Sequence, residues 1–507
     1  MPARGRVGAP RKTVRKALLI GGSLVGVLLL AASAFAAWFD INSWKPSIEA
    51  AVSHATGMEV RIKGKIGLTR WLPPSVVIDD LQSRIRGDAI LNIESVKLSS
   101  LELVPLLRKR VRVSACELVG PVVTVVKDVD GRFNFEFESA SEKATKDAGA
   151  GSISPVLFAA RLSVLRGSYA YVDRKTGARA GLEGLEADVR EFAVSQAGNE
   201  MLLGALSFAG SVACKTAHRA TLTMTDVRSP ITAENGRFAL DALTMDLFGG
   251  KGAGAVVVDV SSLVPRYDIA LQVPRCRVER LLEGLDKQRL LGGEAALALH
   301  VLAAGWNEQE FTKSLSGDVS LDGTGLLAYD IDVDRLIARV EKTRRFSLID
   351  LGAFFIAGPL GTVATKGHDF ARVYRQSQTG HGTLETLVAT WKIKDGIAEA
   401  ADCALATQRN RVAFVGKIDL LQESYQDAVV AVLDDRGCSR FGQRLSGPIA
   451  NPNLLTMSSF QRFAGPIVGL FRAGRRILAP NAKCEVFYNG SVQHPHEAAG
   501  PAHRARR

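Results

Sequence analysis

The chain has 507 residues and a formal net charge of +12, and 47% of its residues are hydrophobic. This length allows two or three domains or one long repetitive domain, with ample apolar side chains for a large buried surface. Six basic residues and no acidic one lie within residues 1–16, so half of the net charge belongs to a short basic arm. The other basic residues are scattered, which argues against a nucleic-acid-binding patch.

A run without a charged residue follows this arm at residues 17–39, ALLIGGSLVGVLLLAASAFAAWF. At a rise of about 1.5 Å per residue, a helix of this length crosses a hydrocarbon core of about 30 Å. The basic arm predicts a cytoplasmic N-terminus, with everything after Asp40 on the other side of the membrane. The predicted anchor contains Ala17, Leu18 and Leu30, and Trp38 is placed near the far interface.

The alternative for this run is a cleaved signal peptide, because Ala34-Phe35-Ala36 resembles a small-x-small cleavage site. The apolar region of a signal peptide usually spans about 7 to 15 residues, which is shorter than this run. We therefore expect a retained anchor. Both alternatives export the rest of the chain.

After the anchor, a short helix is predicted from Ile48 to about Gly57, and apolar and polar residues alternate from Arg61 onward. Alternation of this kind gives a strand one apolar and one polar face. The clearest alternating positions are Phe133, Phe135, Phe137, Ile269, Leu271, Leu297, Leu299, Ala389 and Trp391. Turn residues separate the runs at Asp130-Gly131, Lys175-Thr176-Gly177, Asp322-Gly323 and Asp395-Gly396.

The chain holds roughly twenty strand candidates and few helices. Two architectures accommodate so many strands with one apolar face: two packed sheets, or one long curved sheet whose apolar inner face must be covered. The boundaries that we expect are a β region at residues 40–138, a flexible linker at 139–154, a central β region at 155–330, a helical insertion at 331–375, a C-terminal β region at 376–493 and a disordered tail at 494–507.

Two later stretches interrupt the strand pattern. Val333 to Val340 has helical spacing after a possible cap at Asp332, and the apolar run that follows to Ala364 is interpreted as a buried helix and loop. Pro466 to Leu478 predicts a helix that either packs on the core or lies at a membrane interface. Its apolar side contains Ile467, Leu470 and Phe471, and its basic side contains Arg472, Arg475 and Arg476.

The six cysteines are far apart and form no C-x-x-C motif, so they indicate neither a zinc site nor a thioredoxin-like centre. In an oxidising compartment one or two disulfides can form. We take Cys438 and Cys484 as the best candidate pair, although the sequence alone does not fix connectivity.

No motif in the sequence nominates a catalytic residue, a metal site or a cofactor. Gly250 to Ala255 satisfies a loose dinucleotide pattern but leads into a strand, which favours a glycine-rich hairpin turn. Asp330, Asp332 and Asp334 lack the glycine and glutamate of a calcium loop. His494 and His496 are interpreted as part of a tail. We therefore expect no enzyme.

The order of several short motifs resembles that of the AsmA family of bacterial envelope proteins. The N-terminal motifs are Thr56-Gly57, LELVPLLRKR at residues 101–110, LVGPV at 118–122 and DGRFN at 130–134. The C-terminal motifs are GKGAGAVVVDV at 250–260, residues 314–336, IAGPLGTVATKG at 356–367 and LSGPIANP at 445–452. Residues 175–234 match the family pattern least well.

This resemblance implies a single-pass protein of the bacterial inner membrane with a long, groove-shaped, antiparallel β structure in the periplasm. It implies membrane phospholipids as partners, with an outer-membrane or envelope protein as a further partner, and no nucleic acid. The alternating apolar residues above are then candidates for lining a lipid groove. Two functions are expected: movement of phospholipid toward the outer membrane, or a scaffold with a filled core for outer-membrane protein assembly.

Overall fold

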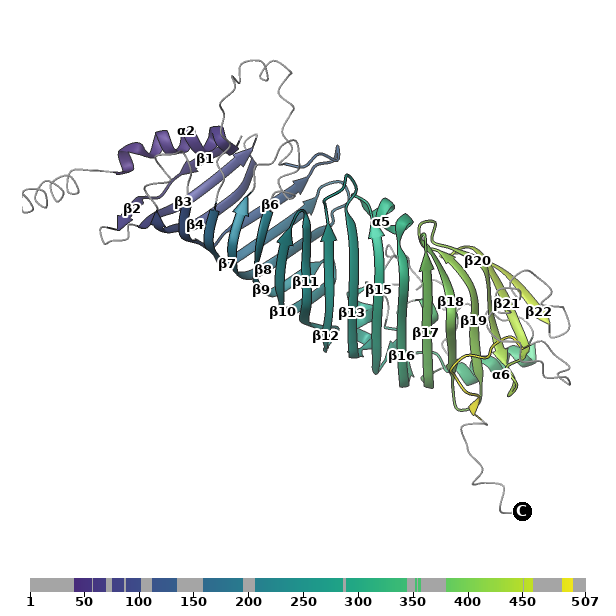
Figure 1. Cartoon of the computed structure of the whole chain (residues 1–507). Coiled ribbons are helices and arrows are strands. Elements are labelled where there is room, and N and C mark those ends of the chain that lie inside the picture. The colour runs from purple at the N-terminus through teal and green to yellow at the C-terminus, as the bar shows by residue number, and fades with distance from the viewer. Residues whose placement is uncertain are drawn as a thin grey trace, which may run out of the picture.

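The computed structural model describes residues 41–56, 58–69, 75–85, 88–101, 112–134, 158–194, 206–285, 289–343, 352, 354–356, 380–449, 451–458 and 486–495. Most of them lie in a single sheet of 22 strands (Figure 1). The first half contains β1 (Glu59–Ile62), β2 (Ile66–Thr69), β3 (Ser75–Ile85), β4 (Asp88–Leu101), β5 (Arg112–Val119), β6 (Val122–Lys127), β7 (Phe158–Asp173), β8 (Arg179–Val194), β9 (Leu206–Arg219), β10 (Leu222–Glu234) and β11 (Arg237–Leu247). The second half contains β12 (Gly250–Asp259), β13 (Arg266–Arg277), β14 (Leu291–Gly292), β15 (Glu294–Ala304), β16 (Ser316–Ala328), β17 (Gly382–Lys394), β18 (Ile397–Ala406), β19 (Arg411–Asp419), β20 (Ser424–Leu433), β21 (Ser439–Pro448) and β22 (Asn453–Ser458).

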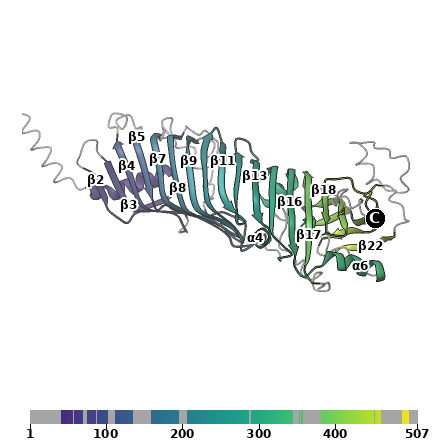
Figure 2. The same cartoon turned by 90° about the horizontal axis from the view of Figure 1, so that it is seen from below.

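From β7 to β22 the sheet is an antiparallel meander in chain order. Each strand pairs with the next, except that the two-residue β14 lies beside β16 while β13 pairs with β15. Seen from below, the strands follow one another along a long curved row (Figure 2). Of the two predicted architectures, the single elongated curved sheet is therefore the one that forms.

Near the N-terminal end, β5 and β6 together form one interrupted strand between β4 and β7. Both pair with β4 antiparallel and with β7 parallel. The interruption is at Gly120, which has φ +60° and whose N–H donates to the carbonyl of Leu165 at 2.8 Å. The positive φ favours glycine at this position, and a Cβ there would also displace the side chain of Glu94, whose nearest atom would lie 2.4 Å away.

The described helices are short. They are α2 (Lys45–Thr56), α4 (Val278–Gly284), α5 (Glu308–Ser314) and α6 (Val333–Thr343), with the 3₁₀ turn η1 (Ile41–Trp44) before α2. Helices were predicted at the positions of α2 and α6, and both predictions are confirmed. The Asp332 carboxylate accepts a hydrogen bond from the Arg335 N–H at 3.0 Å, as expected of a cap. Within the described ranges, every helix is too short or too polar to cross a membrane.

Two predicted turns are wrong. Asp322-Gly323 lies inside β16, opposite Ala296 and Ala295 of β15. The glycine-rich stretch from Gly250 belongs to β12 itself, and the turn before it is Phe248-Gly249. Glycine allows close strand approach here: a Cβ on Gly254 would lie 2.1 Å from the carbonyl oxygen of Ala270. The dinucleotide interpretation is excluded because no helix follows the glycines.

Candidate functional site

One face of the sheet carries apolar side chains that lie directly opposite one another on successive strands; we call it the apolar face. One row across β7 to β9 contains Val164, Ala187 and Val212. A longer row across β12 to β17 contains Gly254, Leu271, Leu299, Val319 and Trp391. Because strands are about 4.8 Å apart, such rows form a continuous apolar surface along the sheet.

From β7 to β9, and at the ends of β10 and β11 nearest α5, the apolar face is not covered by the protein core; we call this part the open section. Most of its side chains are half-buried and lie outside the large hydrophobic cluster, whereas Leu243, Met245 and Leu247, toward the other end of β11, are buried in that cluster. The half-buried side chains include Leu162, Val164, Phe208, Val212, Ile231 and Phe238. Half-exposed apolar side chains in unbroken rows form a patch that soluble proteins rarely leave to water, so this section indicates a ligand or a partner.

Three phenylalanine rings follow one long margin of the open section. Phe192 of β8 stacks on Phe208 of β9 at 6.1 Å between ring centroids, and Phe208 lies 6.4 Å from Phe238 of β11. The row continues through Val258 to Tyr267 of β13, whose ring lies 5.5 Å from that of Phe311 in α5. We call the side of the sheet where α5 lies the α5 margin; Figure 1 shows α5 at the end of β15.

From β15 to β21 the same face is covered and dry; we call this part the closed section. Val278, Leu281 and Leu282 of α4 are fully buried beside β13. Phe354, Phe355 and Ile356 are buried in the same cluster as Trp391. The Trp391 Nε1–H donates to the Phe355 carbonyl at 3.1 Å, and its ring lies 5.3 Å from that of Phe414.

The structure brings six of the nine predicted groove residues onto the apolar face, where they divide into two groups. Ile269, Leu271 and Leu299 are half-buried at the border of the two sections. Leu297, Ala389 and Trp391 are at most 1% exposed, so the prediction that they line a groove is wrong for these three. They pack in the closed section because α4 and residues 354–356 cover them.

The other predicted residues lie elsewhere. Phe133 follows β6, forms a bridge with Lys127 and has the Lys127 ammonium 5.6 Å from its ring centroid. Outside the described residues lie Phe135, Phe137, the anchor positions Ala17, Leu18, Leu30 and Trp38, and the interface-helix positions Ile467, Leu470, Phe471, Arg472, Arg475 and Arg476. The linker at 139–154 also lies outside them.

Sequence reasoning missed the open section between β8 and β11. In LSFAGSVAC of β9, Phe208, Val212 and Cys214 do alternate, but the intervening residues are serine and alanine. Because small residues are neither clearly polar nor clearly apolar, the alternation of apolar and polar residues is weak in this strand. The signal that could have found the strand is its β-branched and aromatic residues at every second position.

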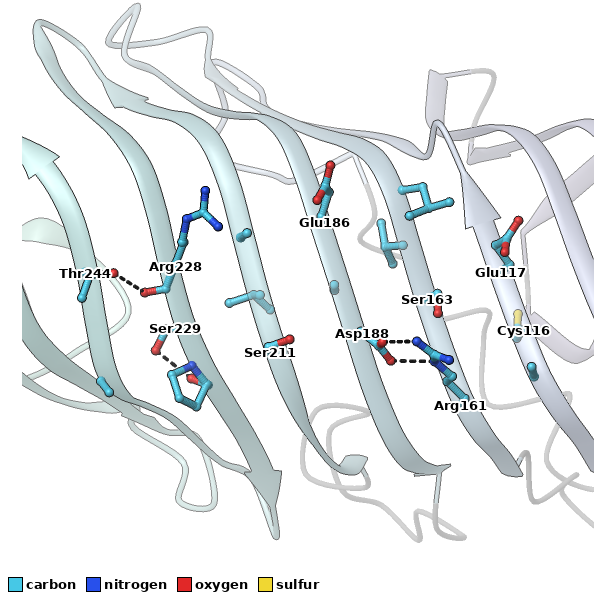
Figure 3. A pocket seen from close by; sticks show the side chains of 18 of the residues that line it. Cys116, Glu117, Arg161, Ser163, Glu186, Asp188, Ser211, Arg228, Ser229 and Thr244 are labelled. Atoms are coloured by element: carbon cyan, nitrogen blue, oxygen red, sulfur yellow. Dashed lines mark hydrogen bonds and ion pairs between the residues drawn. The ribbon is translucent and has the colours of Figure 1, made fainter.

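The opposite, polar face is hollowed across β5 to β11, with a volume of about 710 Å³ (Figure 3). Arg161 and Asp188 form a two-bond ion pair there, with Nε 2.9 Å from Oδ1. The hydrogen bond from Arg161 lowers the pKa of the Asp188 carboxyl. Glu117, Glu186 and Arg228 also line the hollow, so charges of both signs are mixed and no single ligand charge is favoured. In the described part of the chain, no three His, Cys, Asp or Glu side chains are placed to hold a metal ion.

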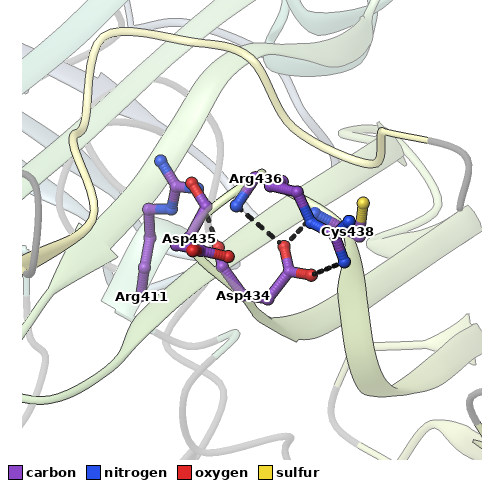
Figure 4. Close-up of polar contacts among 5 residues, drawn as sticks. All are labelled: Arg411, Asp434, Asp435, Arg436 and Cys438. Carbon is purple, nitrogen blue, oxygen red and sulfur yellow. Dashed lines mark hydrogen bonds and ion pairs between the residues drawn. The ribbon is translucent and has the colours of Figure 1, made fainter. Parts of the chain in front are cut away.

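Residues 486–495 cover the polar side of the sheet at β18 to β20. Tyr488 and Val492 are buried against a layer of alanines, and His494 is 5% exposed, so the expectation that a tail begins at His494 is wrong for this residue. Arg411, itself buried, donates to the carbonyl of Val492 at 3.1 Å and to the carbonyl of Asp434 at 3.0 Å; Figure 4 shows Arg411 beside Asp434. These strands are therefore buried on both faces.

Cys438 lies in the turn beside Arg411 and is disulfide-bonded. Its backbone forms a bridge with Val486, and its N–H donates to the Asp434 carboxylate at 2.8 Å. Cys116, Cys214, Cys276 and Cys403 are free thiols. The predicted partner of Cys438, Cys484, lies outside the described residues, so the pairing remains a prediction.

A family model described as "AsmA family" matches residues 12–198 and 206–403, which is most of the chain. The match includes the open section and ends within β18, so the resemblance expected at residues 445–452 lies beyond it. Comparisons with curated proteins and with solved structures gave no match. Family membership is consistent with a role in the cell envelope and in outer-membrane biogenesis. On the extent of this match, the chain belongs to the AsmA family.

Proposed function

We propose that the protein binds phospholipid acyl chains on the open section and conducts phospholipid between the inner and outer membranes, without a chemical step. The observation that carries this proposal is the run of half-exposed apolar side chains on paired, successive strands from β7 to β11. Each CH₂ group removed from water contributes about 0.8 kcal/mol, so acyl chains are held out of water only along such a surface.

The dimensions of the open section support the same occupant. From β7 to β11 there are four strand spacings of about 4.8 Å, which gives a length of roughly 19 Å along the sheet. A hydrocarbon core about 30 Å thick holds two layers of acyl chains, so one layer is about 15 Å deep. The surface can therefore accommodate an acyl chain along its length.

The proposed location is the inner membrane, with the anchor at residues 17–39 spanning it once, the basic arm in the cytoplasm and the sheet in the periplasm. The six basic residues before the anchor support this orientation. A reporter that is active only in the periplasm, fused after Arg507, is expected to be active. An active cytoplasmic reporter at the same position would reverse the orientation and remove the lipid-transfer proposal.

A pair of matched substitutions tests the lipid proposal. Val212→Asp places a carboxylate in the open section, where it can remain hydrated at the free surface, so the folded protein is expected to keep its melting temperature within a few degrees. The same carboxylate would oppose an acyl chain, because an ionised group is costly to bury in hydrocarbon. Lipid that co-purifies with the protein, measured by mass spectrometry, is expected to fall at least several-fold.

Val319→Asp is the matched change in the closed section, where the native side chain is 1% exposed. A carboxylate buried there without a partner is expected to unfold the domain. Val212→Leu serves as the apolar control and should retain lipid. A folded Val212→Asp protein that carries as much lipid as the wild type would reject the proposal.

The second candidate function is a scaffold for outer-membrane protein assembly, and the closed section favours it. From β15 to β21 the apolar face is filled by protein side chains, with Leu321 and Trp391 fully buried, and leaves no surface for lipid. If wild-type protein extracted from membranes carries no lipid above the level of a detergent-exchanged control, the scaffold becomes the better explanation.

A further inference from the structure

Two loops at the α5 margin form a projecting apolar tip that is separate from the apolar face. Leu263 and Val264, between β12 and β13, are 93% and 46% exposed, and Trp306, between β15 and α5, is 54% exposed. Leu263 is more exposed than any other large apolar side chain in the described part of the chain. We call Leu263, Val264 and Trp306 the apolar tip.

The apolar tip is held in place by hydrogen bonds between its two loops. The Trp306 Nε1–H donates to the Leu263 carbonyl at 2.8 Å, and the Gly305 N–H donates to the Pro265 carbonyl at 3.0 Å. The Ser262 hydroxyl donates to the Val264 carbonyl at 2.8 Å. Three successive carbonyls of an exposed loop therefore have protein donors.

This arrangement suits an apolar surrounding better than water. A loop tip in water needs no internal donors, because water satisfies its carbonyl groups. In hydrocarbon or at its boundary, each unsatisfied backbone group costs several kcal/mol. The loop thus satisfies its own polar groups while presenting leucine, valine and the apolar part of an indole outward.

The base of the apolar tip is also well defined. The backbone N–H of Trp306 donates to the Glu310 carboxylate at 2.8 Å. The Asn307 side-chain oxygen caps α5 by accepting from the backbone N–H of Glu310 at 3.0 Å. Gly305 has φ +140°, and a Cβ there would lie 2.4 Å from the Cβ of Glu310, so only glycine allows this approach. The tip is therefore preorganised, and little conformational entropy is lost when it binds.

We propose that the apolar tip inserts into the interface of a lipid bilayer and holds the α5 margin of the sheet against it. A leucine that is exposed on all sides must be enclosed on all sides when buried, which fluid acyl chains achieve without a preformed pocket. Tryptophan favours the membrane–water boundary because its ring is amphipathic. Charges of both signs lie nearby, because Arg266 is paired opposite Asp259 and the Glu310 carboxylate accepts from the Trp306 backbone N–H, so a zwitterionic surface suffices. This contact does not depend on lipid binding by the open section.

Photo-crosslinking tests the proposal in the full chain mixed with phosphatidylethanolamine vesicles that contain a minority of phosphatidylglycerol. Benzoylphenylalanine is introduced at position 263 or, as a control, in place of Leu165, a 41% exposed leucine on the polar face. Lipid adducts on the 263 peptide at least five-fold above those on the 165 peptide are expected. Equal labelling of the two sites, or no labelling at 263, overturns the proposal.

Trp306 provides a second measurement. Brominated acyl chains are expected to quench the part of the tryptophan emission that is lost in Trp306→Phe, and this quenching should disappear in Leu263→Asp. Folding is not at issue, because Leu263 makes almost no buried contact. Unchanged quenching in Leu263→Asp overturns the proposal. A protein crosslink at position 263 in intact cells, with no lipid adduct in vesicles, overturns it in favour of a protein partner.

These outcomes are distinguishable from failure of the proposed function. Co-purified lipid that is lost in Val212→Asp reports on the open section alone. Vesicle crosslinking at position 263 is expected to be the same in Val212→Asp and in the wild type.

Discussion

The indole N–H of Trp391 donates to the carbonyl of Phe355 at 3.1 Å, which joins β17 to a segment 36 residues earlier in the chain. Both residues are fully buried. The bond gives the buried Phe355 carbonyl a hydrogen-bond donor. It also holds residues 354–356 in place over the closed section.

The first prediction concerns this bond. Trp391→Phe should keep most of the packing but leave the Phe355 carbonyl without a partner, at a cost of about 1–3 kcal/mol in unfolding free energy. Trp391→Ala should cost about 3–5 kcal/mol because it also leaves a cavity. Denaturant unfolding followed by circular dichroism measures both. Trp306→Phe, at an exposed position, is the control and should change stability by less than about 1 kcal/mol.

A loss below about 1 kcal/mol for Trp391→Ala would contradict a closed section, because a tryptophan that faces an open surface is removed at little cost.

The closed and open sections illustrate how far the sequence alone leads. YDIALQV of β13 and LVATWKI of β17 alternate in the same way, and both were correctly placed in strands with one apolar face. Their burial differs because Phe355 packs over Trp391 of β17, whereas in β13 only the end near α4, at Val273, is fully buried. Alternation reports which residues share a face, whereas the cover comes from distant segments, and no local pattern reports it.

The second prediction concerns a glycine. Gly317 at the start of β16 has φ +139°, and a Cβ there would lie 2.0 Å from the His300 carbonyl oxygen. Gly317→Ala should therefore destabilise the protein by about 1–3 kcal/mol. Gly67→Ala in β2 is the matched control, since its nearest neighbour would be 3.9 Å away, an ordinary contact. Equal denaturation midpoints for the two variants would show that β16 relaxes without strain.

The third prediction concerns alkaline stability. Burial raises the pKa of Tyr425 in the folded protein. The protonated phenol is therefore favoured by folding, so this contribution to stability is complete below the unfolded pKa of about 10 and is lost as pH rises above it. Tyr425→Phe should melt like the wild type at pH 8 but lose less of its melting temperature between pH 9 and 11, in a series measured by calorimetry. Parallel pH profiles for the two proteins would refute this.

The fourth prediction concerns the cysteines. Burial raises the pKa of the Cys276 thiol to about 11, so folded protein should be alkylated there by iodoacetamide at pH 8 only after urea is added.

A non-reducing peptide map should link the peptide of Cys438 to that of Cys484. An alkylated Cys438 in unreduced protein would disprove the pairing. Burial also raises the pKa of the Cys116 thiol to about 11, but its side chain is only half-buried. Cys116 should therefore be alkylated faster than Cys276 in the folded protein.

The junction between β6 and β7 has a consequence for how the chain acquires its structure. From β7 to β16 each strand pairs with a close neighbour in sequence, so hairpins can form one after another as the chain emerges. At β5 and β6 the pairing with β7 is parallel, so it cannot form as a hairpin. The sheet therefore contains a slow, non-local closure beside a fast, local meander. The N-terminal strands are expected to join last, adding to an edge that β7 already presents.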